Sequence, residues 1–81
     1  TLQTQRSGLL YANTMMNLAD LHRDLRDAET SMREYRLALA AFQAEGAHAG
    51  VGHVLESMGV LAFDSDATPE AERYLQQALQ A

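Results

Sequence analysis

The sequence predicts an all-α fold, in which four helices form two antiparallel hairpins stacked next to each other. Three observations support this prediction. Apolar residues recur every three or four positions, which is the spacing of one helix face. Residues that end or start helices, such as Gly46 and Pro69, separate these apolar stretches. Large and small residues also repeat with a period of 40 positions, and no segment alternates as a strand would.

The length of 81 residues favours a single domain over residues 1–81. A formal net charge of −5 opposes binding to nucleic-acid phosphates and to anionic lipid headgroups. The absence of cysteine excludes disulfides and thiolate metal sites. No apolar run approaches the ~20 residues that span a bilayer, and residues 1–6 do not begin a signal peptide. We therefore expect a cytoplasmic protein that binds neither nucleic acid nor membrane.

The first helix is predicted to begin at about residue 10. Its apolar positions advance by three or four residues, so that one stripe should face the core. The positions expected to face the core are Tyr11, Met15, Leu18, Leu21, His22 and Leu25.

A second helix should follow Asp27, because a short carboxylate before an apolar stripe can cap a helix N-terminus. Gly46 lies just beyond this helix and can take the positive φ angle that often ends one. The positions expected to face the core are Met32, Tyr35, Leu39 and Phe42.

The third helix is predicted to start near His48 and to end in the polar stretch 64–67. Its expected core positions are Val51, Val54, Leu55, Met58, Leu61 and Ala62. A fourth helix should start at Thr68-Pro69-Glu70, where the hydroxyl caps, the proline needs no N–H, and the carboxylate meets the positive end of the helix dipole. Its apolar face consists of Tyr74, Leu75, Ala78 and Leu79.

The repeat of 40 positions relates the first pair of helices to the second pair. Small residues have a steric role in such a repeat, because two antiparallel helices cross closely only where their side chains are small. We expect such crossings where Ala19 meets Ser31 and where Gly59 meets Ala71. The residues that correspond are Met15, Leu18, Ala19, Ser31, Tyr35, Ala38 and Leu39 with Leu55, Met58, Gly59, Ala71, Leu75, Ala78 and Leu79.

These segments resemble the tetratricopeptide repeat family. Residues 17–22 (NLADLH) and 57–62 (SMGVLA) are similar to the first helix of that repeat. Residues 35–39 (YRLAL) and 75–79 (LQQAL) are similar to its second helix. The period of 40 exceeds the common 34, and the linker 42–50 looks like the longer-helix variety found in large bacterial regulators. The resemblance implies a short α-solenoid.

On this resemblance, the first repeat covers about residues 10–45 and the second about residues 48–81. Two features depart from the family pattern. The usual aromatic residue in the middle of the first helix is replaced by His22 in one unit and Ala62 in the other, and the proline often found after the second helix is replaced by Gln43.

Catalytic and metal chemistry find little support in the sequence. His48 and His53 are five positions apart, which turns them about 140° from each other on a helix, too far to share an ion. No glycine-rich loop follows a strand, so no phosphate-binding motif is present. We predict no catalytic residue, no metal and no cofactor. A helical enzyme or metal carrier that uses the three histidines is the weakest of three hypotheses.

The leading hypothesis is a scaffold that binds a protein or peptide. In the family that the chain resembles, ligands usually contact first-helix residues that point away from the second helix. Asn13 and Asn17 could hydrogen-bond a peptide backbone, and Arg23 could pair with a carboxylate. Phe63, Val60 and Met16 could together hold one apolar side chain. Carried over by repeat position, these residues, which we call the inner face, are Asn13, Met16, Asn17, Asp20, Arg23 and Asp24 with His53, Glu56, Ser57, Val60, Phe63 and Asp64.

The alternative hypothesis is a structural or oligomerising segment of a signalling or transcriptional regulator, with no free peptide ligand. Its dimer contact would use outer residues such as Tyr35 and Tyr74. Two hairpins are few for a repeat array, since ~3 units are normally needed for stability. We therefore expect either a piece of a longer array or copies that cover each other's ends as a homo-oligomer.

Overall fold

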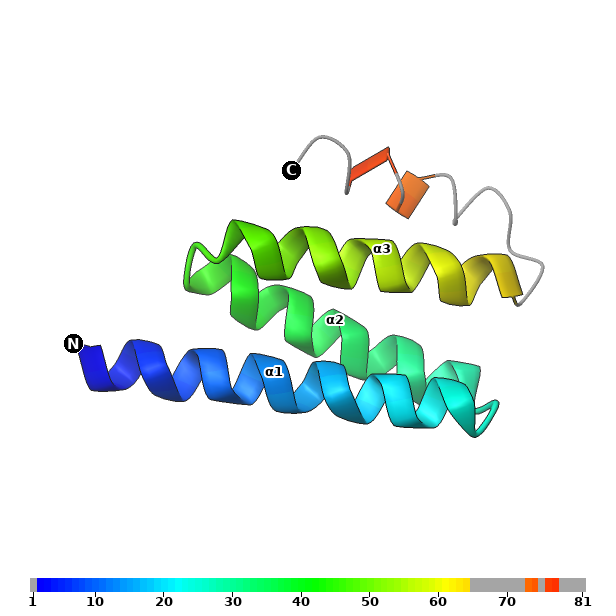
Figure 1. Ribbon diagram of the computed structural model, residues 1–81, viewed down its shortest axis with the longest axis horizontal. Coiled ribbons are helices and arrows are strands. Elements are labelled where there is room, and N and C mark those ends of the chain that lie inside the picture. The colour runs from blue at the N-terminus through cyan, green and yellow to red at the C-terminus, as the bar shows by residue number, and fades with distance from the viewer. Residues whose placement is uncertain (1, 65–72, 75, 78–81) are drawn as a thin grey trace.

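The structure is a computed structural model that describes residues 2–64, 73–74 and 76–77. It contains three long helices, α1 (Leu2–Asp24), α2 (Ala28–Ala44) and α3 (His48–Asp64), and no strand among the described residues (Figure 1). The all-α prediction is thus confirmed for this part of the chain. Residues 73–74 and 76–77 are helical, but the predicted start and most of the apolar face of a fourth helix lie outside the described residues.

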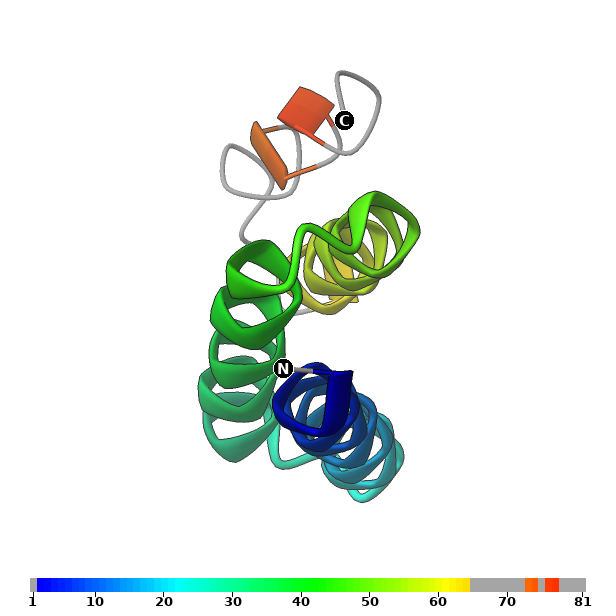
Figure 2. The same cartoon turned by 90° about the vertical axis from the view of Figure 1, so that its left-hand side faces the viewer.

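The three helices form two layers. Seen along the helices, α1 and α3 lie on one side and α2 lies on the other (Figure 2). α2 packs against both neighbours, and successive helices run in opposite directions. The first helices of the two predicted repeats therefore share a side of the molecule, which is the arrangement expected of stacked hairpins.

Helix α1 differs from its prediction in two respects. It begins at Leu2, well before residue 10. The predicted core stripe is wrong at four of its positions, because Tyr11, Leu18, Leu21 and Leu25 are exposed, Leu25 by 67%. Among the residues from 7 to 24 of α1, Ala12 and Ala19 are fully buried. Four exposed apolar residues of α1, with Leu25 directly after its end, instead share an arc of about 100° on the other side of the helix. This α1 apolar face consists of Leu10, Tyr11, Leu18, Leu21 and Leu25.

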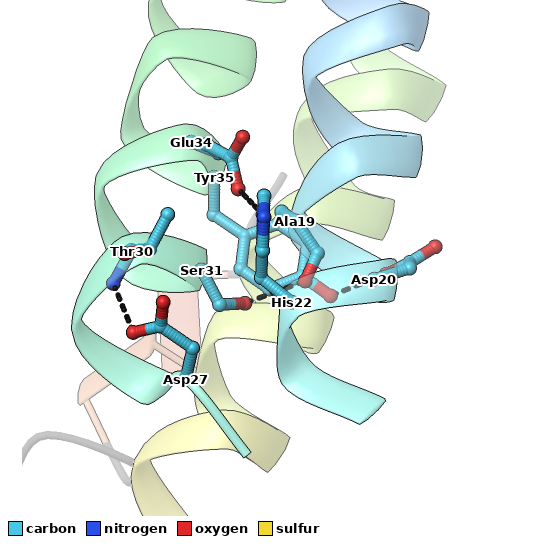
Figure 3. A network of polar contacts seen from close by, with 8 residues as sticks. All are labelled: Ala19, Asp20, His22, Asp27, Thr30, Ser31, Glu34 and Tyr35. Carbon is cyan, nitrogen blue, oxygen red and sulfur yellow. Dashed lines mark hydrogen bonds and ion pairs between the residues drawn. The ribbon is translucent and has the colours of Figure 1, made fainter. Parts of the chain in front are cut away.

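A tight crossing of α1 and α2 explains why alanines occupy the contact. Ala19 and Ser31 are both fully buried, and the Ser31 hydroxyl donates a 2.7 Å hydrogen bond to the Ala19 carbonyl (Figure 3). A hydroxyl can reach a backbone oxygen at this distance only where no larger side chain separates the two helices. The crossing predicted at Ala19 is confirmed. Gly59 is also buried, but its expected partner Ala71 lies outside the described residues.

The turn between α1 and α2 is closed by backbone hydrogen bonds and a side-chain cap. The Arg26 N–H donates to the Arg23 carbonyl at 3.0 Å, and the Asp27 N–H donates to the His22 carbonyl at 2.8 Å. This pair of bonds is the Schellman motif, with Arg26 at a left-handed φ of 63°. The Asp27 side chain then accepts a hydrogen bond from the Thr30 N–H at 3.3 Å, which confirms the predicted cap.

The turn between α2 and α3 repeats this geometry with a different residue. The Gly46 N–H donates to the Gln43 carbonyl at 3.1 Å, the Ala47 N–H donates to the Phe42 carbonyl at 2.9 Å, and Gly46 has a φ of 65°. The positive φ predicted for Gly46 is confirmed. Arg26 occupies the equivalent position at the end of α1.

The largest buried side chains of the core come from α2 and α3. Helix α2 contributes Tyr35, Ala38 and Phe42, and α3 contributes Val54, Leu55, Met58, Leu61 and Ala62, all buried. These include most of the core positions predicted for the two helices. The helices approach closely at Gly50, where a Cβ atom would lie 2.6 Å from Cε1 of the Phe42 ring. None of the described helices has a stretch long and apolar enough to cross a bilayer.

Candidate functional site

The inner face is divided between exposed, half-buried and buried residues. Asn13 and Asn17 on α1 and His53, Glu56, Val60 and Phe63 on α3 are exposed. Met16, Asp20 and Arg23 are half-buried, and Ser57 is buried. The two helices that carry these residues, α1 and α3, lie on the same side of α2 (Figure 2). The structure therefore leaves most of the predicted residues accessible to a partner.

The asparagines of α1 keep hydrogen-bonding capacity for a ligand. The Asn13 amide donates one bond to the Leu9 carbonyl, at 3.0 Å along its own helix. That bond uses one of the two amide protons and leaves the side-chain oxygen available as an acceptor. Asn17 is exposed one helical turn further on, so the two amides continue one stripe.

Asp20 contacts both Tyr35 on α2 and Arg23 on its own helix. The Tyr35 phenol reaches from α2 and donates a hydrogen bond to Oδ1 of Asp20 (Figure 3). The Arg23 guanidinium lies 3.8 Å from the same carboxylate oxygen. Burial of the phenol, followed by its hydrogen bond to Asp20 and the charge of that carboxylate, raises the pKa of Tyr35 far above its ordinary value. Asp20 is thus held in place by a buried hydroxyl.

Ser57 points into the structure. Its side chain donates a hydrogen bond to the His53 carbonyl at 3.0 Å, and the residue is 8% exposed. It also lies close enough to the Tyr35 phenol to oppose, in small part, the rise of that pKa. The buried end of the Tyr35 side chain therefore lies where all three helices meet. Ser57 belongs to this junction, and its side chain is directed inward and is not available to a ligand.

Two exposed apolar residues stand on the inner face of α3. Val60 is 43% exposed and Phe63 is 56% exposed. Glu56 lies one turn before Val60 and Asp64 one turn after it, so carboxylates flank the apolar pair along the helix. The partly buried Met16 is the third member of the predicted apolar anchor and packs against the core.

The ends of the helices enclose a hollow of about 520 Å³. Its lining joins residues from all three helices and from the first turn, namely Arg23, Asp24, Arg26, Ala28, Leu61 and Asp64. Arg23, Asp24 and Asp64 were predicted as inner-face residues, and the hollow brings them together. Arg26 was missed, because the prediction followed helix stripes and Arg26 lies between two helices. The predicted cap at Asp27 could have drawn attention to Arg26, because the residue before a helix cap in a short turn lies at the end of the previous helix.

The histidines have separate surroundings. His22 lies 2.5 Å, through its Nδ1 atom, from Oε1 of Glu34 and so joins α1 to α2 (Figure 3). His48 and His53 are exposed on α3. In the part of the chain that the structure describes, no three metal-ligating side chains form a group that could hold an ion.

Comparison with known proteins gives one match. The profile of the family described as Tetratricopeptide repeat matches residues 10–81. No curated protein and no solved structure matches the chain. Repeats of this family generally mediate protein–protein interactions and are not catalytic. The match covers most of the sequence and agrees with the helical hairpin and its small-residue crossing, so the chain belongs to the tetratricopeptide repeat family.

Proposed function

We propose that this chain is a regulatory module that binds a protein or peptide through its inner face, as part of a larger cytoplasmic bacterial protein. The observation that carries the proposal is the hollow, because it joins inner-face residues of α1 to residues of α3 in one accessible depression. The repeat period of 40 supports the regulatory and bacterial part of the proposal, since it resembles the period found in large bacterial regulators.

The chemistry of the inner face suits an extended or helical segment with one apolar anchor. Asn13 and Asn17 offer hydrogen bonds to a backbone, which do not depend on the partner's side chains. Val60 and Phe63 offer exposed apolar area on the facing helix. Polar and apolar contacts would thus come from different helices, and a partner that touches both would be held in one orientation.

Substitution on the inner face tests the proposal. A display library of random peptides is selected on the full chain, and the affinity of each selected peptide is measured by fluorescence anisotropy. Asn17→Ala and Glu56→Ala should each weaken binding by about tenfold, which is ~1.4 kcal/mol, without lowering the melting temperature. Arg36→Ala changes an exposed residue of α2 and should leave the affinity unchanged. Equal losses for all three variants would place the binding surface elsewhere.

The α1 apolar face favours a second candidate function, which is self-association. Monomeric proteins rarely expose large contiguous apolar patches, and this face carries four leucine or tyrosine residues that are each at least 48% exposed. The dimer contact expected at Tyr35 is wrong, because Tyr35 is fully buried. Size-exclusion chromatography with light scattering tests this candidate. A dimer that Leu18→Gln and Leu21→Gln convert to monomer would support it, and a monomer at high concentration would exclude it.

A further inference from the structure

The two described turns solve the same geometric problem with different residues. Both close a helix with the Schellman pair of hydrogen bonds, and the residue at the turning point has a φ of 63° in one turn and 65° in the other. The second turn uses Gly46, which adopts this left-handed conformation without a steric penalty. The first turn uses Arg26, whose Cβ atom makes the same conformation unfavourable.

The fold itself gains nothing visible from the arginine side chain. Arg26 is exposed, and within the described residues its guanidinium forms no ion pair and no hydrogen bond. All the bonds that close the turn are made by backbone atoms, which glycine would supply equally well. A residue kept in an unfavourable backbone conformation points to a role outside folding.

The side chain lines the hollow. Arg23 and Arg26 come from the end of α1 and the turn, and Ala28 marks the first turn of α2, where free N–H groups and the helix dipole favour negative charge. Opposite them, α3 contributes the apolar Leu61 and the carboxylate of Asp64. The side of the hollow nearest the turn therefore carries two guanidinium groups and the carboxylate of Asp24, and the α3 side carries apolar surface and a second carboxylate.

We infer that Arg26, together with Arg23, binds the carboxylate of an acidic side chain of the partner peptide; this inference rests on the proposed function. Guanidinium groups bind carboxylates through paired, charge-assisted hydrogen bonds. Asp24 and Asp64 also line the hollow and repel a second acidic group nearby. The preferred peptide therefore has one acidic residue with neutral or basic neighbours, which also suits a chain whose net charge is −5.

The decisive variant is Arg26→Gly, because stability and binding should change in opposite directions. Glycine relieves the backbone, so the melting temperature should rise by about 4–8 °C. The same variant should bind the peptides selected from the random display library with an affinity lower by about tenfold or more. Arg26→Lys keeps the charge and the backbone penalty but loses the paired hydrogen bonds, and it should bind with intermediate affinity. Arg36→Gln removes a positive charge from the exposed surface of α2 and should alter neither quantity.

A change in the peptide completes the test. Replacing the acidic residue of a selected peptide with glutamine should lower its affinity for the natural chain by about tenfold. The same replacement should hardly change its affinity for the Arg26→Gly variant, because the pairing is already lost there. Selected peptides without a shared acidic residue, undiminished binding by Arg26→Gly, or a lower melting temperature of that variant would each overturn the inference.

The same experiment separates this inference from the proposed function. Peptides that depend on Asn17 and Glu56 but not on Arg26 would leave the inner face as the binding surface and reject the role of Arg26. If selection yields no peptide, or only peptides whose affinity does not depend on Asn17, Glu56 or Arg26, both the proposed function and the inference fail.

Discussion

Helices α1 and α3 lie on the same side of α2 (Figure 2), yet they bury their residues differently. On helix α3 the side chains of Val54, Leu55, Met58 and Leu61 are each at most 4% exposed. Helix α1 buries two alanines fully and exposes the five residues of the α1 apolar face. Both helices carry large apolar residues, so the presence of such residues does not by itself explain the difference.

The number of neighbours does explain it. Helix α3 packs against α2, and Tyr74 also packs against the core cluster. Among the described elements, helix α1 packs mainly against α2 and only slightly against α3, and the close approach to α2 at Ala19 and Ser31 favours small residues. In stacked hairpins the large residues of a first helix are buried by whatever covers its second side, and the hairpin alone does not bury them.

The largest expected effect comes from truncating one residue on each of these helices. Met58→Ala on α3 removes a side chain that is 1% exposed and should cost about 2–5 kcal/mol of unfolding free energy, enough to unfold much of a small domain. Leu21→Ala on α1 changes a half-exposed side chain and should cost ~0.5 kcal/mol or less. Urea unfolding followed by circular dichroism measures both. A similar cost for the two variants would mean that α1 is covered on its second side in solution.

A smaller effect separates two glycines within α3. Gly50→Ala places a methyl group against the buried Phe42 ring, and such overpacking costs about 1–3 kcal/mol. Gly52→Ala meets no atom within 4 Å, so alanine's better helix propensity should stabilise α3 by about 0.5–1 kcal/mol. Melting temperatures should therefore move in opposite directions. If both variants stabilise the chain, α2 and α3 are more loosely packed than described.

The smallest effect concerns Tyr35, which links α1 to α3. Tyr35→Phe removes the hydrogen bond to the half-exposed Asp20, which water can replace, and should cost about 0.5–1.5 kcal/mol. The pH dependence is more specific. Because folding raises the pKa of Tyr35, its contribution to stability is complete below the ordinary tyrosine pKa of ~10 and is lost as pH rises above that value.

The sequence makes this alkaline test unusually clean. It contains neither lysine nor cysteine, and arginine does not titrate, so tyrosines are the side chains that ionise between about pH 9 and 12. Urea midpoints should fall over this range for the natural chain and much less for Tyr35→Phe. Tyr11→Phe changes an exposed ring and should leave the decline intact. If the urea midpoint of Tyr35→Phe fell with pH as steeply as that of the natural chain, the burial of the Tyr35 phenol would not be the cause of the decline.

The sequence predicted the parts of this fold that local chemistry determines. Asp27 and Gly46 marked helix ends, and the sizes of Ala19 and Ser31 located a crossing. The orientation of α1 could not be obtained in this way, because its leucines form a good helical stripe whichever side has a neighbour. For the inner face, repeat position predicted which residues lie beside each other, but not that Ser57 turns inward to the Tyr35 junction or that Arg26 joins the hollow. Both depend on contacts between helices that one helix's spacing does not contain.

The spacing of two contacts between α1 and α2 limits how this hairpin can change during evolution. Ser31 and Tyr35 are one turn apart on α2, and they reach the adjacent residues Ala19 and Asp20 on α1. If α2 slid by one turn, about 5.4 Å, the tyrosine ring would have to occupy the space that now admits only a hydroxymethyl group. The hairpin therefore has a single alignment. Insertions or deletions within the helices should break the pairing outright, so length variation is tolerable only in the loops.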